Sequence, residues 1–250
     1  MNFLEGKILA FDKPYRQTSF KLVAHVRWIL TRRMEGRRLR VGHAGTLDPL
    51  ATGVLIVCTG RATSIIEQLQ GHDKEYVAEL RLGETTASYD LEHPVNATFP
   101  TEHITEELLR ATVARLTGDI MQIPPAFSAC NIDGKRAYEL ARKGREVNLQ
   151  AKPVHIESIE IEEVRLPDYV RLRIRCGKGT YIRSLARDIG EALGSGAHLL
   201  SLRRTRVGDI CAEQCWTMEG FEEWLAGQEI DTTPPEGQKP KEYPLLLCQA

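Results

Sequence analysis

The sequence predicts an α+β protein whose mixed, mainly antiparallel central sheet is flanked by helices. Apolar residues alternate at the two-residue period of a strand in Tyr169–Cys176 and follow the helical period in Ser19–Arg33. Short connections between such segments favour antiparallel neighbours. A length of 250 residues with 42% hydrophobic content is sufficient for this fold to build its own core.

The N-terminal elements surround a glycine-rich loop. A strand in residues 6–14 ends at Asp12-Lys13-Pro14, and a helix follows with Ser19 as its N-cap and an end near Arg33. The apolar stripe of this helix is predicted to contain Phe20, Val23, Val26 and Leu30. The loop Gly42–Gly53 then leads into a buried strand, Val54–Cys58.

Alternating strands and helices continue to about residue 193. The predicted strands are Glu75–Leu82, Val154–Val164 with a break in its alternation, and Tyr169–Cys176; the predicted helices are Thr105–Leu116, Ala137–Lys143 and 182–193. In Tyr169–Cys176 the apolar face is opposed by Arg171, Arg173 and Arg175. The residues beyond Gly227 are predicted to form a loose tail.

Positive charge is concentrated in two blocks although the whole chain carries a net charge of −1. Residues 1–61 contain eleven Lys and Arg against four Asp and Glu, and residues 165–206 contain ten against three, so each block has a net charge of +7. Local clusters of this kind hold phosphates regardless of overall charge. The alternative is solvated surface charge; because both blocks also hold the most unusual motifs, the pattern favours a nucleic-acid-binding face.

Membrane, export and metal functions find little support in the sequence. The longest apolar run is Val54–Cys58, and the first residues form no apolar signal, so we expect a cytoplasmic protein without a membrane span. Six scattered cysteines include no C-x-x-C pair. The spacing Cys211-x₃-Cys215 is a weak zinc pattern, and free thiols are the favoured interpretation.

The segment Gly42–Gly53 contains the strongest candidate for chemistry, Asp48. Its glycines permit tight backbone geometry, and Pro49 restricts Asp48 to extended conformations that aim the carboxylate. A carboxylate on a stiff loop beside an arginine-rich helix end is a plausible nucleophile or base. The spacing alone also fits an ordinary Asp-Pro turn.

Two aromatic residues and two cations form a second set of candidates. Tyr76 has the chemistry to stack on an extruded base, although a core tyrosine fits as well. Tyr181 and Arg183 open a helix after a loop containing Lys178, where phosphate or a carboxylate partner is suited to bind. An ordinary capped helix start is the alternative.

At these positions the sequence resembles the bacterial tRNA pseudouridine-55 synthases, the TruB family. The resemblance covers about residues 6–210 in family order. It rests on GHAGTLDPLATG at 42–53, KEY at 74–76 with LGETT at 82–86 and Asp90, QIPPAFSA at 122–129 with GKRAY at 134–138, KGTYIR at 178–183 with DIG at 188–190, and GAHLLSLRR at 196–204.

The resemblance implies a pseudouridine synthase fold that converts uridine 55 in the T-arm loop of tRNA without cofactor or metal. By the family pattern Asp48 is the nucleophile, Tyr76 stacks on the flipped base, and Arg183 forms a charge network with Asp48 and Asp90. His43 helps to hold the flipped-out loop. The substrate-binding residues expected beside these are Tyr181 and Leu202, which line the base pocket, and Lys178.

The resemblance also implies a domain organisation. We expect a catalytic domain over residues 1–212, containing an RNA-gripping insertion at 122–153, and a short C-terminal helix and tail over 213–250 in place of a complete RNA-binding PUA domain. The expected partner is tRNA, bound by a monomer. Arg16 and Asn131 depart from the family pattern, which has glycine and lysine there, and neither touches the expected chemistry.

Two other functions remain alternatives. An RNA-binding or tRNA-folding module without activity would retain the basic faces, but this chain also retains Asp48, Tyr76 and Arg183. A hydrolase or phosphotransferase with an aspartyl nucleophile would need a metal constellation or a phosphate loop, and Gly177-Lys178-Gly179-Thr180 is too short for a Walker A motif.

Overall fold

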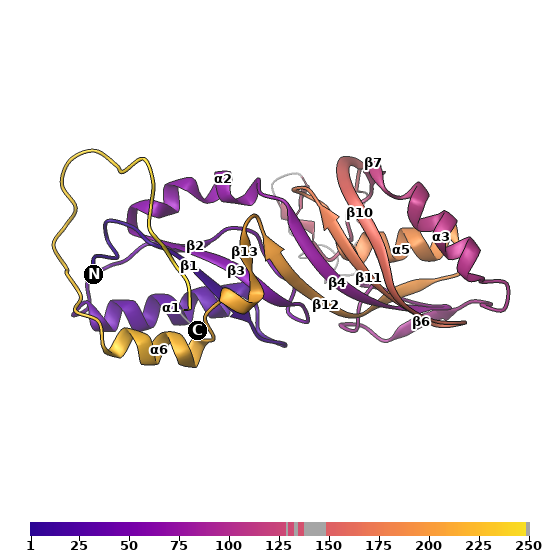
Figure 1. The fold of residues 1–250 in the computed structure, drawn as a ribbon, viewed down its shortest axis with the longest axis horizontal. Helices are drawn as coiled ribbons and strands as arrows, with labels where there is room; N and C mark the ends of the chain where they lie inside the picture. The colour runs from indigo at the N-terminus through magenta and orange to yellow at the C-terminus, as the bar shows by residue number, and fades with distance from the viewer. Residues whose placement is uncertain (129, 133–134, 138–148, 249–250) are drawn as a thin grey trace. The chain divides into compact units, whose positions relative to one another are not determined.

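The computed structural model describes residues 1–248 except 129, 133–134 and 138–148. The chain divides into two compact units (Figure 1). Unit 1 comprises Met1–His72 and Arg203–Ala250, and unit 2 comprises Asp73–Leu202. The chain returns from unit 2 to unit 1 within strand β12 (Ala197–Val207).

Unit 1 is built on a mixed, mainly antiparallel sheet. Its strands are β1 (Ile8–Lys13), β2 (Val41–His43), β3 (Thr52–Thr59), the C-terminal part of β12, β13 (Ile210–Cys211) and β14 (Leu245–Leu246). Strand β3 pairs antiparallel with β1 and β2, and its first residues pair in parallel with Arg203 and Arg204 of β12. The tail returns to the sheet, because β14 pairs in parallel with β1.

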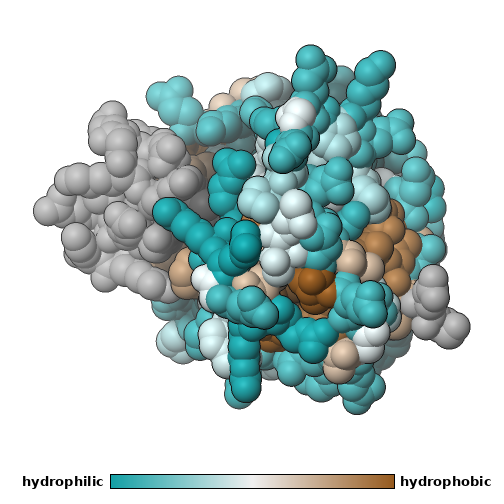
Figure 2. All heavy atoms as spheres, turned by 90° about the vertical axis from the view of Figure 1, so that its left-hand side faces the viewer, coloured by the Kyte–Doolittle hydropathy of each residue, from teal (hydrophilic) through white to brown (hydrophobic). Residues whose placement is uncertain are grey.

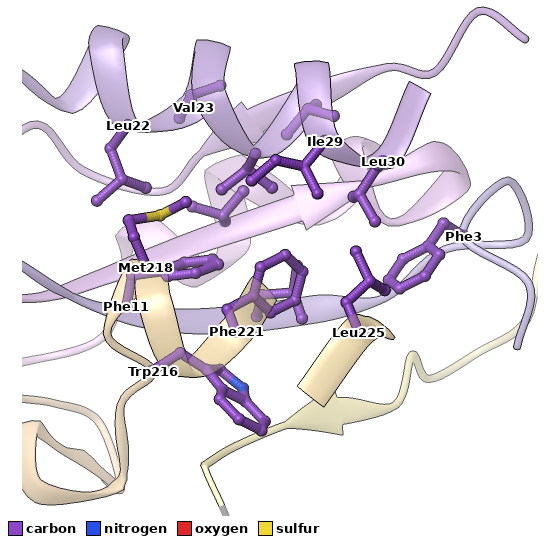
Figure 3. Packing of buried hydrophobic residues seen from close by; sticks show 14 of the residues in the cluster. Phe3, Phe11, Leu22, Val23, Ile29, Leu30, Trp216, Met218, Phe221 and Leu225 are labelled. Atoms are coloured by element: carbon purple, nitrogen blue, oxygen red, sulfur yellow. The ribbon is translucent and has the colours of Figure 1, made fainter. Parts of the chain in front are cut away.

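Helices cover both faces of this sheet. In Figure 1, α1 (Ser19–Arg33) and α6 (Met218–Ala226) lie along one face, and η1 (Gly60–Ile65) with α2 (Ile66–Gln70) lies on the other. Alternation along β1 divides the core accordingly: Leu9 and Phe11 face α1 and α6, whereas Ile8 and Ala10 face the opposite side. Figure 3 shows Phe11 and Phe221 meeting between the helices, with ring centroids 5.1 Å apart.

The start of α1 corrects two sequence expectations. Thr18, not Ser19, is the N-cap, because its hydroxyl accepts a hydrogen bond from the Lys21 amide. Phe20 is 73% exposed and lies outside the buried stripe. At about 100° per residue, Phe20 lies about 120° from Val26, which is at the centre of that stripe.

Unit 2 contains a second antiparallel arrangement of strands in the order β4 (Lys74–Leu82), β11 (Tyr169–Cys176), β10 (Lys152–Arg165) and β7 (Gly118–Gln122). Helix α3 (Glu106–Arg115) contacts β10, and α5 (Ile182–Ala192) contacts β4. Two small hairpins, β5 (Glu84–Thr86) with β6 (Val95–Thr98) and β8 (Asn131–Ile132) with β9 (Lys135–Arg136), complete the unit. The predicted α+β class and mainly antiparallel sheet are confirmed.

The predicted elements of unit 2 agree closely with these bounds. Tyr169–Cys176 is a strand as predicted, and the broken alternation before it reflects register shifts after Ile156 and Ile161. Apart from Ala137, the predicted helix Ala137–Lys143 lies outside the described residues, and so do residues 129, 133–134 and 144–148 of the predicted insertion 122–153. Strands β2 and β12 were not predicted, because Gly42 interrupts the short first strand and a run of charged residues occupies the second.

Candidate active site

Asp48 lies half-buried in a short loop, residues 44–51, between β2 and β3 of unit 1. The loop starts where the Ala44 amide donates to the Ile56 carbonyl at 2.9 Å. It closes with a turn in which the Ala51 amide donates to the Asp48 carbonyl at 3.1 Å. The carboxylate is therefore presented from a backbone turn anchored to a central strand.

Ser19 fixes the residue before Asp48. Its hydroxyl donates to the Leu47 carbonyl at 3.0 Å and accepts from the Leu47 amide at 2.9 Å. Ser19 is 2% exposed and Leu47 3% exposed, so water does not compete for these bonds. The first residue of α1 therefore sets the backbone immediately before the carboxylate.

Lys13 fixes the residue after Asp48. Its ammonium group is fully buried and donates to the carbonyls of Pro14 at 2.9 Å, Gln17 at 2.6 Å and Pro49 at 3.3 Å. Burial lowers the pKa of Lys13 to about 8, against the opposing effect of the Asp48 charge, which raises it. Three carbonyl acceptors and a nearby carboxylate compensate the cost of burying this cation.

Arg204 holds the two ends of the loop. Its Nη2 atom donates to the Gly45 carbonyl at 3.1 Å, and its Nε atom donates to the Val54 carbonyl at 2.8 Å. The side chain is 2% exposed. Gly53 permits this arrangement, because a Cβ atom added there would lie 2.1 Å from the Arg204 carbonyl oxygen.

His43 is the last residue of β2 and directly precedes the loop. Burial is the main reason that the pKa of His43 lies below its usual value, and the positive charge of Arg204 lowers this pKa further. Its Nδ1 atom is buried and has no hydrogen-bond partner within the residues that the structure describes. A buried polar atom in this state is suited to a ligand contact.

In unit 2, two of the candidate residues, Arg183 and Asp90, form a buried ion pair. The Arg183 Nε atom lies 3.8 Å from Asp90 Oδ2, and both side chains are buried. Arg183 also donates to the carbonyls of Ser88 at 3.2 Å and Phe127 at 2.9 Å. Asp90 in turn accepts from the Ser88 hydroxyl and the Glu92 amide. These bonds fix the orientation of the guanidinium and retain its charge.

Tyr76 lies in β4 opposite Ile174 of β11 and is 8% exposed. Tyr181 precedes α5 and is held by Gln122, which accepts from the Tyr181 amide at 2.8 Å and donates to its carbonyl at 3.2 Å. Lys178 is exposed in the loop before α5, and Leu202 is half-buried at the end of unit 2. The structure therefore brings Arg183 and Asp90 together in unit 2, and it places Asp48 in the loop of unit 1 that His43 directly precedes.

The arginine row of β11 is neutralised by carboxylates. Glu75 pairs with Arg173 at 2.7 Å and with Arg175 at 3.0 Å. Glu162 pairs with Arg171 at 3.0 Å and with Arg173 at 2.6 Å. The row of arginines that the sequence indicated on this face is therefore paired within the sheet, because strand pairing places acidic residues beside each arginine.

Three residues that position Asp48 were missed by sequence reasoning. Ser19 was assigned to the helix cap, Lys13 was treated as the end of a strand, and Arg204 was one charge in a basic block. The sequence signals that could have identified these residues were weak. Lys13 stands between an apolar strand and a proline, and Arg204 is one of several arginines in a strand.

The described residues contain neither a metal-binding cluster nor a membrane-spanning helix. Within the described parts of the chain, no group of three or more His, Cys, Asp or Glu side chains is placed to hold a metal ion. Cys215 directs its thiol to the Cys211 carbonyl at 3.4 Å. No helix in the described ranges has the length and apolarity required to span a bilayer.

Comparison with known proteins gives consistent matches along the chain. The model of the TruB family pseudouridylate synthase N-terminal domain matches residues 31–182. The model of the tRNA pseudouridylate synthase B C-terminal domain matches residues 183–243.

The chain is also similar to curated proteins and to solved structures. A curated relative from Bacteroides thetaiotaomicron, named tRNA pseudouridine synthase B, is 61% identical over 234 residues, covering 92% of this chain and 98% of the relative. A relative of the same name from Flavobacterium johnsoniae is 46% identical over 224 residues, covering 89% and 97%. Among solved structures, a chain of a Cbf5-Nop10-Gar1 complex superposes with a TM-score of 0.65 at 29% identity, covering 89% of this chain and 55% of that one.

Proposed function

Because the chain belongs to the TruB family of pseudouridylate synthases, we propose that it isomerises uridine to pseudouridine in tRNA, at position 55 of the T-arm loop. The observation that carries this proposal is the 61% identity to a tRNA pseudouridine synthase B over nearly the full length of both chains. The position of Asp48 in a loop held on both sides supports it independently.

Asp48 is the nucleophile of the proposed reaction. Its carboxylate promotes cleavage of the N-glycosidic bond between uracil N1 and ribose C1′. The freed uracil rotates, a C5–C1′ bond forms, C5 loses its proton and N1 gains one. The product has the same atoms and oxidation state as the substrate, so the proposed reaction proceeds without a cofactor.

The other candidates bind and orient the substrate. A uridine folded into the T-loop is inaccessible, so the nucleotide must be extruded and stacked, which is the role proposed for Tyr76. Asp90 orients Arg183, and the role proposed for Arg183 is to keep the reacting carboxylate ionised in the substrate complex, because a cation favours the anion. His43 supports the displaced loop through its Nδ1 atom, which has no hydrogen-bond partner among the described residues. Tyr181 and Leu202 line the base pocket, and Lys178 binds backbone phosphate.

The remaining features of the proposal concern organisation. We propose that residues 1–212 form the catalytic domain with an RNA-gripping insertion at 122–153, followed by a short C-terminal helix and tail over residues 213–250. The protein acts on tRNA as a cytoplasmic monomer in this proposal.

The test is tritium release from a tRNA transcript labelled at uridine C5. The wild-type protein is expected to release about one tritium per tRNA, and Asp48→Asn is expected to release none above background. Asp119→Asn is the matched control, because this exposed carboxylate pairs only at the surface with His155. Absence of release by the wild type, with tRNA binding retained, would favour the alternative of an inactive RNA-binding module.

A further inference from the structure

A groove of about 620 Å³ lies beside the end of α1 in unit 1. Its walls come from α1, from residues 36–42 and from η1 and α2, and three of its lining residues are Arg27, Arg38 and Arg40. We call it the arginine groove. The end of unit 1 at which α1 terminates is largely hydrophilic when viewed from that side (Figure 2).

The local sequence explains why the arginines point outward. Glu35 and Gly36 adopt left-handed backbone conformations, with φ of 54° and 81°, and turn the chain back after α1. Met34, Leu39 and Val41 then anchor the returning segment in the core, at 0%, 3% and 8% exposure. The arginines at 38 and 40 flank these anchors and stay exposed.

The positive charge of the groove is not cancelled by the protein. Considering the described residues only, no carboxylate lies within ion-pair distance of Arg27, Arg38 or Arg40. Arg27 instead donates to the Val41 carbonyl at 2.9 Å, which leaves its charge intact. The arginines of β11 differ in this respect, because each of them pairs with Glu75 or Glu162.

The groove is also placed to guide a polyanion toward Asp48. Val41 and Gly42 line it and belong to β2, whose last residue, His43, begins the loop that carries the carboxylate. Guanidinium groups bind phosphate with paired hydrogen bonds, and exposed arginines without carboxylate partners lose little on binding it.

We propose that the arginine groove binds the sugar-phosphate backbone of the tRNA substrate, outside the residues that hold the reacting uridine. This inference rests on the proposed function and adds to it: of the two basic blocks in the sequence, the N-terminal one provides the long-range affinity. Arg38 and Arg40 each contact phosphate, and the contact acts on binding rather than on the chemical step.

The experiment compares Arg38→Ala/Arg40→Ala with the wild type. Loss of two phosphate contacts is expected to reduce the slope of log K against log salt by about 1.4 to 1.8. The KM for tRNA should rise about 10-fold at moderate salt, while kcat at saturating tRNA stays within about two-fold. Arg38→Lys/Arg40→Lys retains both charges and should keep the wild-type slope.

Arg110→Ala/Arg165→Ala is the matched control, since it removes two charges that Glu106 and Glu163 already pair. Its slope should equal that of the wild type. An equal loss of slope in the control, or an unchanged slope and KM in Arg38→Ala/Arg40→Ala, overturns the groove proposal. Tritium release by the wild type is scored separately, so failure of the proposed function is distinguishable from failure of the groove.

Discussion

Arg204 joins Gly45 to β3, with Nη2 donating to the Gly45 carbonyl at 3.1 Å and Nε donating to the Val54 carbonyl at 2.8 Å. Gly45 lies three residues before Asp48, and Val54 lies six residues after it. One buried side chain thus connects the two ends of the segment that presents the carboxylate. The loop is thereby tied to a central strand, which is the arrangement that preorganised sites require.

Replacing Arg204 with lysine should therefore impair turnover more than tRNA binding. Lysine keeps the charge but does not reach both carbonyls in the same geometry. We expect kcat to fall about 10- to 100-fold with little change in KM, because small displacements of a reacting group are costly. One unsatisfied buried carbonyl should lower the free energy of unfolding by about 1–3 kcal/mol.

Arg203→Lys is the control for this substitution. Arg203 is the neighbouring residue, but its side chain is 40% exposed and pairs with Asp12. An ion pair of this exposure contributes about 0–1 kcal/mol, so stability and kcat should stay close to wild type. Equal kinetic losses in both variants would contradict a specific role for Arg204.

Gly53→Ala should unfold or strongly destabilise unit 1. Gly53 has φ of 101°, and its added Cβ would lie 2.1 Å from the Arg204 carbonyl oxygen. Gly118→Ala is the matched control, since Gly118 has φ of 96° and nothing within 4 Å of an added Cβ. Denaturant unfolding should show a loss of about 1–2 kcal/mol for the control and more than about 4 kcal/mol for Gly53→Ala. Similar losses would show that backbone strain alone accounts for the effect.

Thr18 and Ser19 are adjacent but should respond differently to alanine. Thr18→Ala removes the α1 cap and should cost about 1 kcal/mol of stability with kcat unchanged. Ser19→Ala leaves the Leu47 amide and carbonyl without their partner, so a comparable stability loss should be joined by a fall in kcat of about 10-fold. Steady-state kinetics and thermal unfolding of the two variants separate the effects; an unchanged kcat in Ser19→Ala would remove Ser19 from the positioning of Asp48.

The sequence was informative where a local pattern controls structure. The alternation of Tyr169–Cys176 predicted β11 at its observed bounds, and the glycine and proline residues around Asp48 predicted a stiff loop. Phe20 was misplaced because it was assigned to the stripe for its apolar character, although its position on the helix lies about 120° from the centre of the stripe.

The support of the loop was not predictable in the same way. Lys13 and Arg204 act on Asp48 through hydrogen bonds to backbone carbonyls, and a carbonyl has no sequence signature. Arg204 lies 156 residues from Asp48 along the chain, so only the pairing of β12 with β3 brings it to the loop. The ion pair of Arg173 with Glu75 was not predictable for a similar reason, because the pairing of two neighbouring strands brings the two side chains together.

The burial of Lys13 beside Asp48 should be visible in its titration. The pKa of Lys13 is lowered to about 8 by burial, while the negative charge of Asp48 raises it. Asp48→Asn removes that charge, so the pKa of Lys13 should fall further. The measurement is an NMR titration of lysine side chains labelled with ¹³C at Cε, in which one resonance has a midpoint near 8 in the wild type and a lower midpoint in Asp48→Asn. An unchanged midpoint would show that the two charges are not coupled.

The lowered pKa of Lys13 also determines how the free energy of unfolding depends on pH. Above pH 8 the folded protein has lost a proton that the unfolded chain retains until about pH 10.4, so the unfolded state binds more protons in this window. The free energy of unfolding contributed by Lys13 should therefore rise with pH between about 8 and 10.4, by up to about 1.4 kcal/mol per pH unit. Denaturant unfolding of wild type and Lys13→Arg across this range isolates the contribution, because arginine does not titrate there. If the wild type instead became less stable relative to Lys13→Arg as the pH rises, Lys13 would be held in its charged form and not driven toward the neutral amine.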